Sequence, residues 1–240
     1  MSQAPLLEAV DLVMRFGGVV AVNGVSMRIN EGELHCLIGP NGAGKSTFFK
    51  MLSGQLRPSS GQVRLRGRSI VGLPASGVAR LGIGLKTQAP SVFDGLTALE
   101  SVRIAANVGL PPYLARKRAD ESLERMRVTH LADRRVGRLA HGERQLVELA
   151  MVIAQAPDLL LLDEPAAGMT GEEVEHLGDL IVELSQSSSV IVVEHDMDFI
   201  RRIARTVTVF NQGVVLAEGP ADAVMADPRV RDVYLGKEAA

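Results

Sequence analysis

The sequence is poor in cysteine and in aromatic residues, and it carries little excess charge. Its 240 residues include one cysteine, no tryptophan and 3% aromatic residues, and the formal net charge is −2. One cysteine excludes an internal disulfide, which is typical of a reducing compartment. A near-neutral chain has no general attraction to nucleic acid or anionic lipid, and few aromatic side chains leave few platforms for stacked bases. We therefore expect no nucleic-acid partner.

Long apolar runs are also absent. None approaches the roughly 18 residues of a membrane span, and Leu159–Leu162 and Val190–Val193 both lead into charged residues. The N-terminus has no basic segment followed by an apolar one, so no secretion signal is expected. The hydrophobic content of 46% is nevertheless enough for a substantial core. Cys36, in an apolar run, is expected to be a buried hydrophobe, and any membrane role is expected to come through a partner.

What the chain does contain is the phosphate-binding pattern G-x-x-x-x-G-K-[ST]. It lies between an apolar run, Leu34–Ile38, and a helical run, Phe48–Leu52, which is the strand–loop–helix context that the pattern requires. Glycines let the loop curl so that backbone N–H groups point at an anion, and the helix N-terminus adds positive potential. Lys45 is expected to reach the β- and γ-phosphates, and Ser46 to hold Mg²⁺. The residues of this loop are Gly39, Pro40, Asn41, Gly42, Ala43, Gly44, Lys45, Ser46 and Thr47.

The remaining chain alternates short apolar segments with helical ones. The expected strands cover residues 6–12, 19–29, 33–38, 61–66, 83–85, 159–163, 190–193, 207–210 and 214–217. The expected helices cover residues 46–54, 74–80, 142–155, 172–185 and 196–204. Residues 97–138 form a charge-rich helical block that Pro111 and Pro112 interrupt. This alternation predicts an α/β fold whose parallel sheet is covered on both faces.

One apolar strand ends in two carboxylates, Asp163 and Glu164. The carboxyl ends of parallel strands are where open α/β sheets bind ligands. Asp163 is suited to Mg²⁺ binding, directly or through water, and Glu164 could orient and deprotonate a water molecule. A strand that merely ends in acids is the alternative, and the nearby phosphate loop makes it the weaker interpretation.

Three further side chains have two interpretations each. His195, just past the strand 190–193, is either a solvated or capping residue or a donor to the γ-phosphate. Gln88, after the strand 83–85, is either an ordinary loop amide or a ligand of Mg²⁺ or of the attacking water. Phe16 precedes Gly17 and is either strand-end core or an aromatic face for an adenine ring.

Together these residues resemble the ATP-binding subunits of ABC transporters, and the resemblance covers essentially the whole chain. The phosphate loop corresponds to Walker A, and residues 159–164 correspond to Walker B with its catalytic glutamate. Gln88 falls at the Q-loop, His195 at the H-switch and Phe16 at the adenine-stacking A-loop. Where the family signature Leu-Ser-Gly-Gly-Gln belongs, this chain has Leu139, Ala140, His141, Gly142 and Glu143.

The resemblance implies a fold and a set of cofactors. The fold is an ABC-type P-loop nucleotide-binding domain, with a RecA-like, mostly parallel core sheet, an N-terminal antiparallel β-subdomain and a helical subdomain. Residues 1–240 would form a single ABC ATPase domain, in which 1–88 and 139–240 make the core with its β-subdomain and 89–138 the helical subdomain. ATP and Mg²⁺ would be the cofactors. Glu164, His195 and Gln88 would be catalytic, and Ser46, Gln88 and Asp163 would hold the metal.

The resemblance also implies partners. Two such domains stack head to tail, so that each ATP lies between one Walker A loop and the partner's signature. Their closure and reopening drive a membrane permease through the Gln88 loop and the helical block. The second ATPase subunit is either a copy of this chain or a paralogue, and a solute-binding protein acts indirectly. Such a subunit is peripheral, on the cytoplasmic face of the bacterial inner (plasma) membrane.

Ala140, His141 and Thr170 depart from the family pattern in ways that bear on function. Ala140 replaces the signature serine, and the loss of a hydrogen bond to a charged group, about 1.5–3 kcal/mol, would weaken closure about tenfold to a hundredfold. His141 replaces a glycine, and it either restores a donor or faces outward. Thr170 stands where most members have aspartate, which bears on how tightly the two ATP sites are coupled.

Within the family the chain is most similar to importer subunits for urea, amides and branched-chain amino acids. The similarity lies in the signature His-Gly-Glu, in residues 164–170, in Val-Glu-His-Asp-Met and in residues 227–236. The signature histidine with Met169 and Thr170 is most similar to the urea type. The alternative is a soluble ABC ATPase that acts on ribosomes or DNA, but those usually carry two cassettes or a long coiled-coil insertion, and neither is present. A P-loop kinase or GTPase would not explain the signature or His195.

Overall fold

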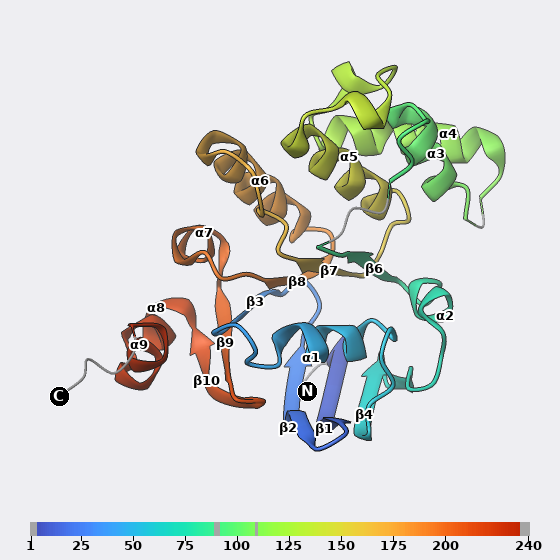
Figure 1. Cartoon of the computed structure of the whole chain (residues 1–240). Helices are drawn as coiled ribbons and strands as arrows, with labels where there is room; N and C mark the ends of the chain where they lie inside the picture. Colours follow the sequence, from blue (N-terminus) through green and yellow to red (C-terminus); the bar gives the residue numbers. More distant parts are fainter. Residues whose placement is uncertain (1–3, 89–91, 109, 236–240) are drawn as a thin grey trace.

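The computed structural model describes residues 4–88, 92–108 and 110–235. Residues 89–91 and 109 of the predicted helical subdomain therefore lie outside the described part. The strands form two sheets (Figure 1). An antiparallel sheet has the order β2-β1-β4-β5, with β1 Leu7–Phe16, β2 Val19–Ile29, β4 Ser60–Leu65 and β5 Arg68–Ser69. The second sheet has the order β10-β9-β3-β8-β7-β6, with β3 Leu34–Ile38, β6 Ile83–Lys86, β7 Leu159–Asp163, β8 Ser189–Val193, β9 Thr206–Asn211 and β10 Val214–Pro220.

Helices flank this second sheet, in which β10 is antiparallel and the other strands are parallel. They are α1 Lys45–Leu52, α2 Ala75–Ala79, α3 Ala98–Ala106, α4 Pro112–Arg125, α5 His141–Ile153, α6 Gly171–Leu184, α7 Met197–Ile203, α8 Ala221–Ala226 and α9 Pro228–Leu235, with 3₁₀ turns η1 Thr129–Leu131 and η2 Val136–Arg138. In Figure 1, α1 lies between the two sheets, while α3, α4 and α5 gather near the β6 edge. No helix in the described part of the chain is long and apolar enough to span a membrane.

The parallel strands are mostly apolar because both of their faces are buried. In β7, Leu160 and Leu162 pack into a core with α5, α6 and α7, whereas Leu159 and Leu161 pack into a second core with α1 and the antiparallel sheet. A strand buried on both faces reads as a continuous apolar run rather than an alternating one. The α/β fold with a mostly parallel sheet and a separate antiparallel sheet is thus confirmed.

Strands β6, β7 and β8 end at the same level, at the carboxyl edge of the parallel sheet. Lys86 of β6 lies opposite Leu162 of β7, and Asp163 of β7 lies opposite Val193 of β8. The residues that follow β6, β7 and β8 therefore emerge side by side. This register is what positions the site.

The C-terminal helices α8 and α9 were not predicted, because each is short. Helices α3 and α4 pack on each other and on α5, but the division into a core and a helical subdomain at residues 89–138 stays a prediction.

Cys36 is fully buried in β3, as expected. Burial, together with the nearby Glu194 carboxylate, raises the pKa of the Cys36 thiol to about 12. A thiol with so high a pKa stays protonated and unreactive at neutral pH.

Candidate active site

The phosphate loop leads from the end of β3 into α1, which begins at Lys45. Gly39 has φ +146° and Gly44 has φ +103°. A side chain at Gly39 would run into the carbonyl of Phe210, and one at Gly44 into the carbonyl of Ala21. Only glycine fits at either position, so the loop is packed against strands β9 and β2 in the curled shape that an anion-binding loop needs.

Lys45 lies across this loop rather than out in solvent. It is 7% exposed, and its Nζ donates to the carbonyls of Gly39, at 2.6 Å, and Pro40, at 3.1 Å. Burial lowers the pKa of Lys45, while the carboxylates of Glu164 and Asp163 oppose that shift. A hollow of about 170 Å³ lies over the loop, lined by Ala21, residues 41–47 and Glu164. The ammonium and the Glu164 carboxylate thus face the same small polar hollow.

Glu164 contacts both of the other predicted catalytic residues, Gln88 and His195. Gln88 Nε2 donates to Glu164 Oε2 at 2.7 Å, and His195 Nδ1 lies 3.7 Å from Glu164 Oε1. The three side chains follow β6, β7 and β8, which are neighbours in the sheet. Glu164 itself has φ +46°, an uncommon conformation for a residue with a side chain. Its N–H donates to the carbonyl of Val193 at 2.9 Å, which ties it to the adjacent strand.

Asp163, at the end of β7, is 8% exposed. Burial raises the pKa of Asp163, the neighbouring Glu164 raises it further, and Lys50, Lys86 and Lys45 oppose the rise. Among the described residues, no three His, Cys, Asp or Glu side chains converge as a metal site. Mg²⁺ commonly takes only one or two carboxylates and completes its shell with phosphate oxygens and water. One buried carboxylate beside a phosphate loop that carries the Ser46 hydroxyl fits that pattern.

Phe16 lies at the end of β1, and 47% of it is exposed. It pairs across the hairpin with Val19, which is also exposed. Phe16 is therefore not part of the buried core. The ring is available for stacking, and its contact with an adenine stays a prediction.

The signature residues surround the start of α5. Ala140 is the N-cap residue, Leu139 is half-buried, and Gly142 is buried where a side chain would overlap the Glu173 carboxylate of α6. Glu143 accepts the N–H of Ala140 at 2.9 Å and pairs with Arg134 at 3.0 Å. None of the five signature residues lines the hollow over the phosphate loop. The signature is therefore not brought to this chain's own loop.

The other two departures from the family pattern have local partners. Thr170 caps α6: its hydroxyl accepts the N–H of Glu173 at 3.4 Å and donates to the Glu173 carboxylate at 3.0 Å. His141 Nε2 lies 3.0 Å from the carbonyl oxygen of Ala167. His141 is exposed, and its ring nitrogen contacts the loop that follows Glu164.

Three buried charges beneath the site were not foreseen. Lys86 Nζ lies 3.6 Å from Glu148 Oε2, and both side chains are almost fully buried. Burial lowers the pKa of Lys86, whereas Glu148, Asp163 and Glu194 oppose that shift. Burial raises the pKa of Glu194, which accepts the N–H groups of Ala166 and His195, each at 3.1 Å. The available signal was a charged residue inside an otherwise apolar strand or helix, as at Lys86 and Glu148.

The chain is similar to many known proteins along its length. The family described as ABC transporter matches residues 22–167, and the family described as branched-chain amino acid ATP-binding cassette transporter matches residues 214–240. The high-affinity branched-chain amino acid transport ATP-binding protein BraF of Pseudomonas aeruginosa is 37% identical, with 97% of this chain and 98% of that protein covered. LivG of Salmonella typhimurium, described in the same words, is 37% identical, with 99% and 100% covered. The lipopolysaccharide export system ATP-binding protein LptB of Acidithiobacillus ferridurans is 35% identical, with 97% and 98% covered.

Solved structures of ATP-binding cassettes are also similar to this chain. The crystal structure of a nucleotide-free ATP-binding cassette from an ABC transporter matches with a TM-score of 0.88 and 27% identity, over 97% of this chain and 100% of that one. The ADP conformation of an ATP-binding cassette of an ABC transporter matches with the same TM-score and identity, over 98% and 100%. The chain therefore belongs to the ABC transporter family, as an ATP-binding subunit that hydrolyses ATP.

Proposed function

We propose that Glu164 is the general base for ATP hydrolysis in this chain. The observation that carries the proposal is the convergence of Gln88, Glu164 and His195 beside the phosphate loop. Lys45 and the loop N–H groups would hold the phosphates of ATP. Glu164 would take a proton from the attacking water, while the Gln88 amide keeps that carboxylate in place and His195 donates to the γ-phosphate.

The residues around the loop also support a place for Mg²⁺. Ser46 in the first turn of α1, the buried Asp163 and the Gln88 amide oxygen are the donors proposed to hold it. When bound, the ion would neutralise charge on the β- and γ-phosphates. Asn41, Gly42, Ala43 and Thr47 complete the nucleotide-binding loop, and Phe16 would stack on the adenine.

A second ATPase subunit would complete each site. The signature residues 139–143 lie outside the hollow over this chain's own loop, so they are free to face the ATP of a partner. The N-terminus of α5, a helix of 13 residues, would add its positive end to that contact. The partner is either a copy of this chain or a paralogous subunit.

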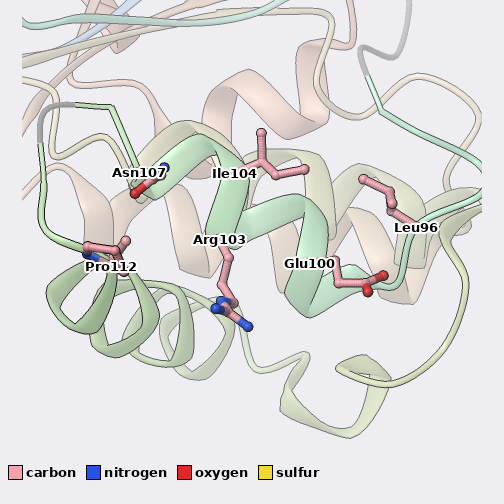
Figure 2. Close-up of a pocket in the computed structure, with 7 residues that line it drawn as sticks. Leu96, Glu100, Arg103, Ile104, Asn107 and Pro112 are labelled. Atoms are coloured by element: carbon pink, nitrogen blue, oxygen red, sulfur yellow. The ribbon is translucent and has the colours of Figure 1, made fainter.

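The helical block offers a surface for permease subunits. A hollow of about 330 Å³ lies where α3 meets the start of α4, lined by Leu96, Glu100, Arg103, Ile104, Asn107, Pro112 and Ala115 (Figure 2). Most of the large apolar side chains that are exposed in the described chain lie between residues 93 and 114, namely Phe93, Ile104, Val108, Tyr113 and Leu114. Exposed apolar side chains gathered in this way typically mark an interaction surface. Docking there would place the subunit on the cytoplasmic face of the bacterial inner membrane, with a solute-binding protein acting indirectly.

The solute is proposed from the relatives. BraF and LivG are named as branched-chain amino acid transport proteins, and the family that matches the C-terminal residues is also described as a branched-chain amino acid transporter. Import of branched-chain amino acids is therefore favoured over import of urea or amides. The export protein LptB is similar at 35% identity, but the C-terminal match favours the importer group.

Replacing Glu164 with glutamine tests the catalytic role. The amide keeps the shape of the side chain and cannot accept the proton of water, so Glu164→Gln is expected to bind ATP normally and to lose turnover by about 10²–10⁴-fold. ATP binding is measured with a fluorescent analogue and turnover by phosphate release. Lys45→Ala is the matched control and is expected to lose binding as well. Normal turnover in Glu164→Gln would remove Glu164 from the role of base.

Replacing Ile104, which is 53% exposed, tests the docking surface. Ile104→Asp places a charge in the apolar hollow, so the variant is expected to lose copurification with permease subunits from native membranes. Its ATP binding in isolation is expected to be unchanged, because Ile104 lies outside the hollow over the phosphate loop. Retained copurification would place the permease contact elsewhere.

A further inference from the structure

His141 is held against the loop that carries the proposed base. A backbone carbonyl can only accept a hydrogen bond, so the imidazole donates from Nε2 to Ala167 O, at 3.0 Å. Gly168, the next residue, has φ +73°, and a side chain there would press on the His141 ring at 3.1 Å. The turn is thus packed on the imidazole as well as bonded to it.

The same turn determines the backbone of Glu164. Ala167 N–H donates to the carbonyl of Glu164 at 3.2 Å, which closes a turn over residues 164–167. Glu164 sits in this turn at φ +46°, a conformation that persists only when its surroundings impose it. Two hydrogen bonds through Ala167 therefore join the signature position 141 to the residue that bears the proposed base.

Gln145, one helical turn after His141, contacts the same ring nitrogen. Its buried amide nitrogen lies 3.2 Å from His141 Nε2, and its amide oxygen has no hydrogen-bond partner among the described residues. The Nε2 proton already points to Ala167, so Nε2 has no lone pair for the amide nitrogen. An amide turned end for end places its oxygen beside the Nε2–H group, where it shares that single proton with Ala167 O as a second acceptor. Gln145 and Ala167 then both bind the same ring nitrogen.

We propose that His141 is a positioning residue that couples the signature of this chain to its own catalytic carboxylate. Contact of the signature with the partner's ATP would then bear directly on the turn that holds Glu164, and this links the two ATP sites. The inference rests on the proposed roles of Glu164 and the signature. It gives the histidine at this signature position a function that a glycine could not supply.

Three substitutions separate the hydrogen bond from the volume of the side chain. His141→Gln places an N–H group near the position of Nε2, His141→Phe fills the space without a donor, and His141→Gly removes both. The Phe and Gly variants are expected to lose about tenfold in kcat, the effect of one hydrogen bond, with KM for ATP unchanged. The Gln variant is expected to keep most of the activity. Hydrogen exchange of the amides in residues 166–170 is expected to quicken in the Phe and Gly variants alone.

Two outcomes overturn the inference: unchanged kcat in all three variants, or a loss in His141→Gln as large as in His141→Phe. Thermal unfolding of each variant is measured alongside, because a purely structural role would lower stability without this pattern in kcat. The Glu164→Gln experiment separates the two proposals. If Glu164→Gln is inactive and the His141 variants are normal, only the coupling fails; if Glu164→Gln is active, the proposed base fails.

Discussion

At the scale of single residues, Gly142 shows how close packing determines residue type at this site. Its neighbour is the Glu173 carboxylate, which stands where a side chain of residue 142 would lie. That carboxylate in turn binds the N–H and the hydroxyl of Thr170, so it cannot move without uncapping α6. A small residue in the signature is thus required by the start of the neighbouring helix.

Gly142→Ala is therefore expected to destabilise the chain by about 1–3 kcal/mol through overpacking, despite the better helix propensity of alanine. Urea unfolding measures the change. Gly171→Ala is the matched control, because Gly171 also lies in the first turn of a helix but has open space around it. Equal stability of the two variants would show that the Glu173 carboxylate moves aside without lowering the free energy of unfolding.

Buried ionic residues such as Lys86 and Glu148 mark the limit of prediction at this scale. Each is a lone charge in an apolar segment, and the sequence does not say that the two face each other between β6 and α5. The same holds for His141, whose partner is a backbone carbonyl far along the chain. Side-chain chemistry could be read from the motifs, but these pairings depend on tertiary packing.

At the scale of elements, helix α5 has an incomplete N-terminal cap. Glu143 accepts the N–H of Ala140, which is one half of a capping box, but the methyl group of Ala140 cannot accept the N–H of residue 143. Helix α3 has both halves, in Thr97 and Glu100. The signature helix therefore begins with one backbone donor fewer satisfied than a serine would allow.

Ala140→Ser is expected to complete this cap and stabilise the chain by about 0.5–2 kcal/mol. The added hydroxyl also restores a donor to the partner's phosphate, so ATP-dependent dimerisation is expected to strengthen. Light scattering with Glu164→Gln as the background, which prevents turnover, measures the dimer yield. A lower yield in the serine variant would contradict this account of the signature.

Elements were predictable where burial imposes a simple pattern. Leu159–Leu162 of β7 and Val190–Val193 of β8 are apolar because both faces of these strands are covered. Helix α6 is preceded by Thr170, with Glu173 at the capping position. Helices α8 and α9 have neither a continuous apolar run nor a capping pair, and they are short and partly exposed. The positions of α8 and α9 depend on packing against β9 and β10, and no local sequence pattern predicts that packing.

At the scale of the whole molecule, one edge of the parallel sheet brings together most of the proposed ATP site but not the signature residues. The phosphate loop, Glu164, Gln88 and His195 come together because β3, β6, β7 and β8 run parallel and end on one side. The signature emerges from another part of the surface. We therefore expect a single chain to hold ATP and a neighbouring subunit to be needed to enclose it.

The specific ATPase activity of the purified chain, measured over about a hundredfold range of protein concentration, tests this claim most directly. If hydrolysis requires two subunits, activity per chain is expected to rise with concentration, or with added paralogous subunit, and to level off as dimers saturate. Activity per chain that stays constant from the most dilute to the most concentrated sample would contradict the account. It would mean that one subunit holds every group that hydrolysis needs.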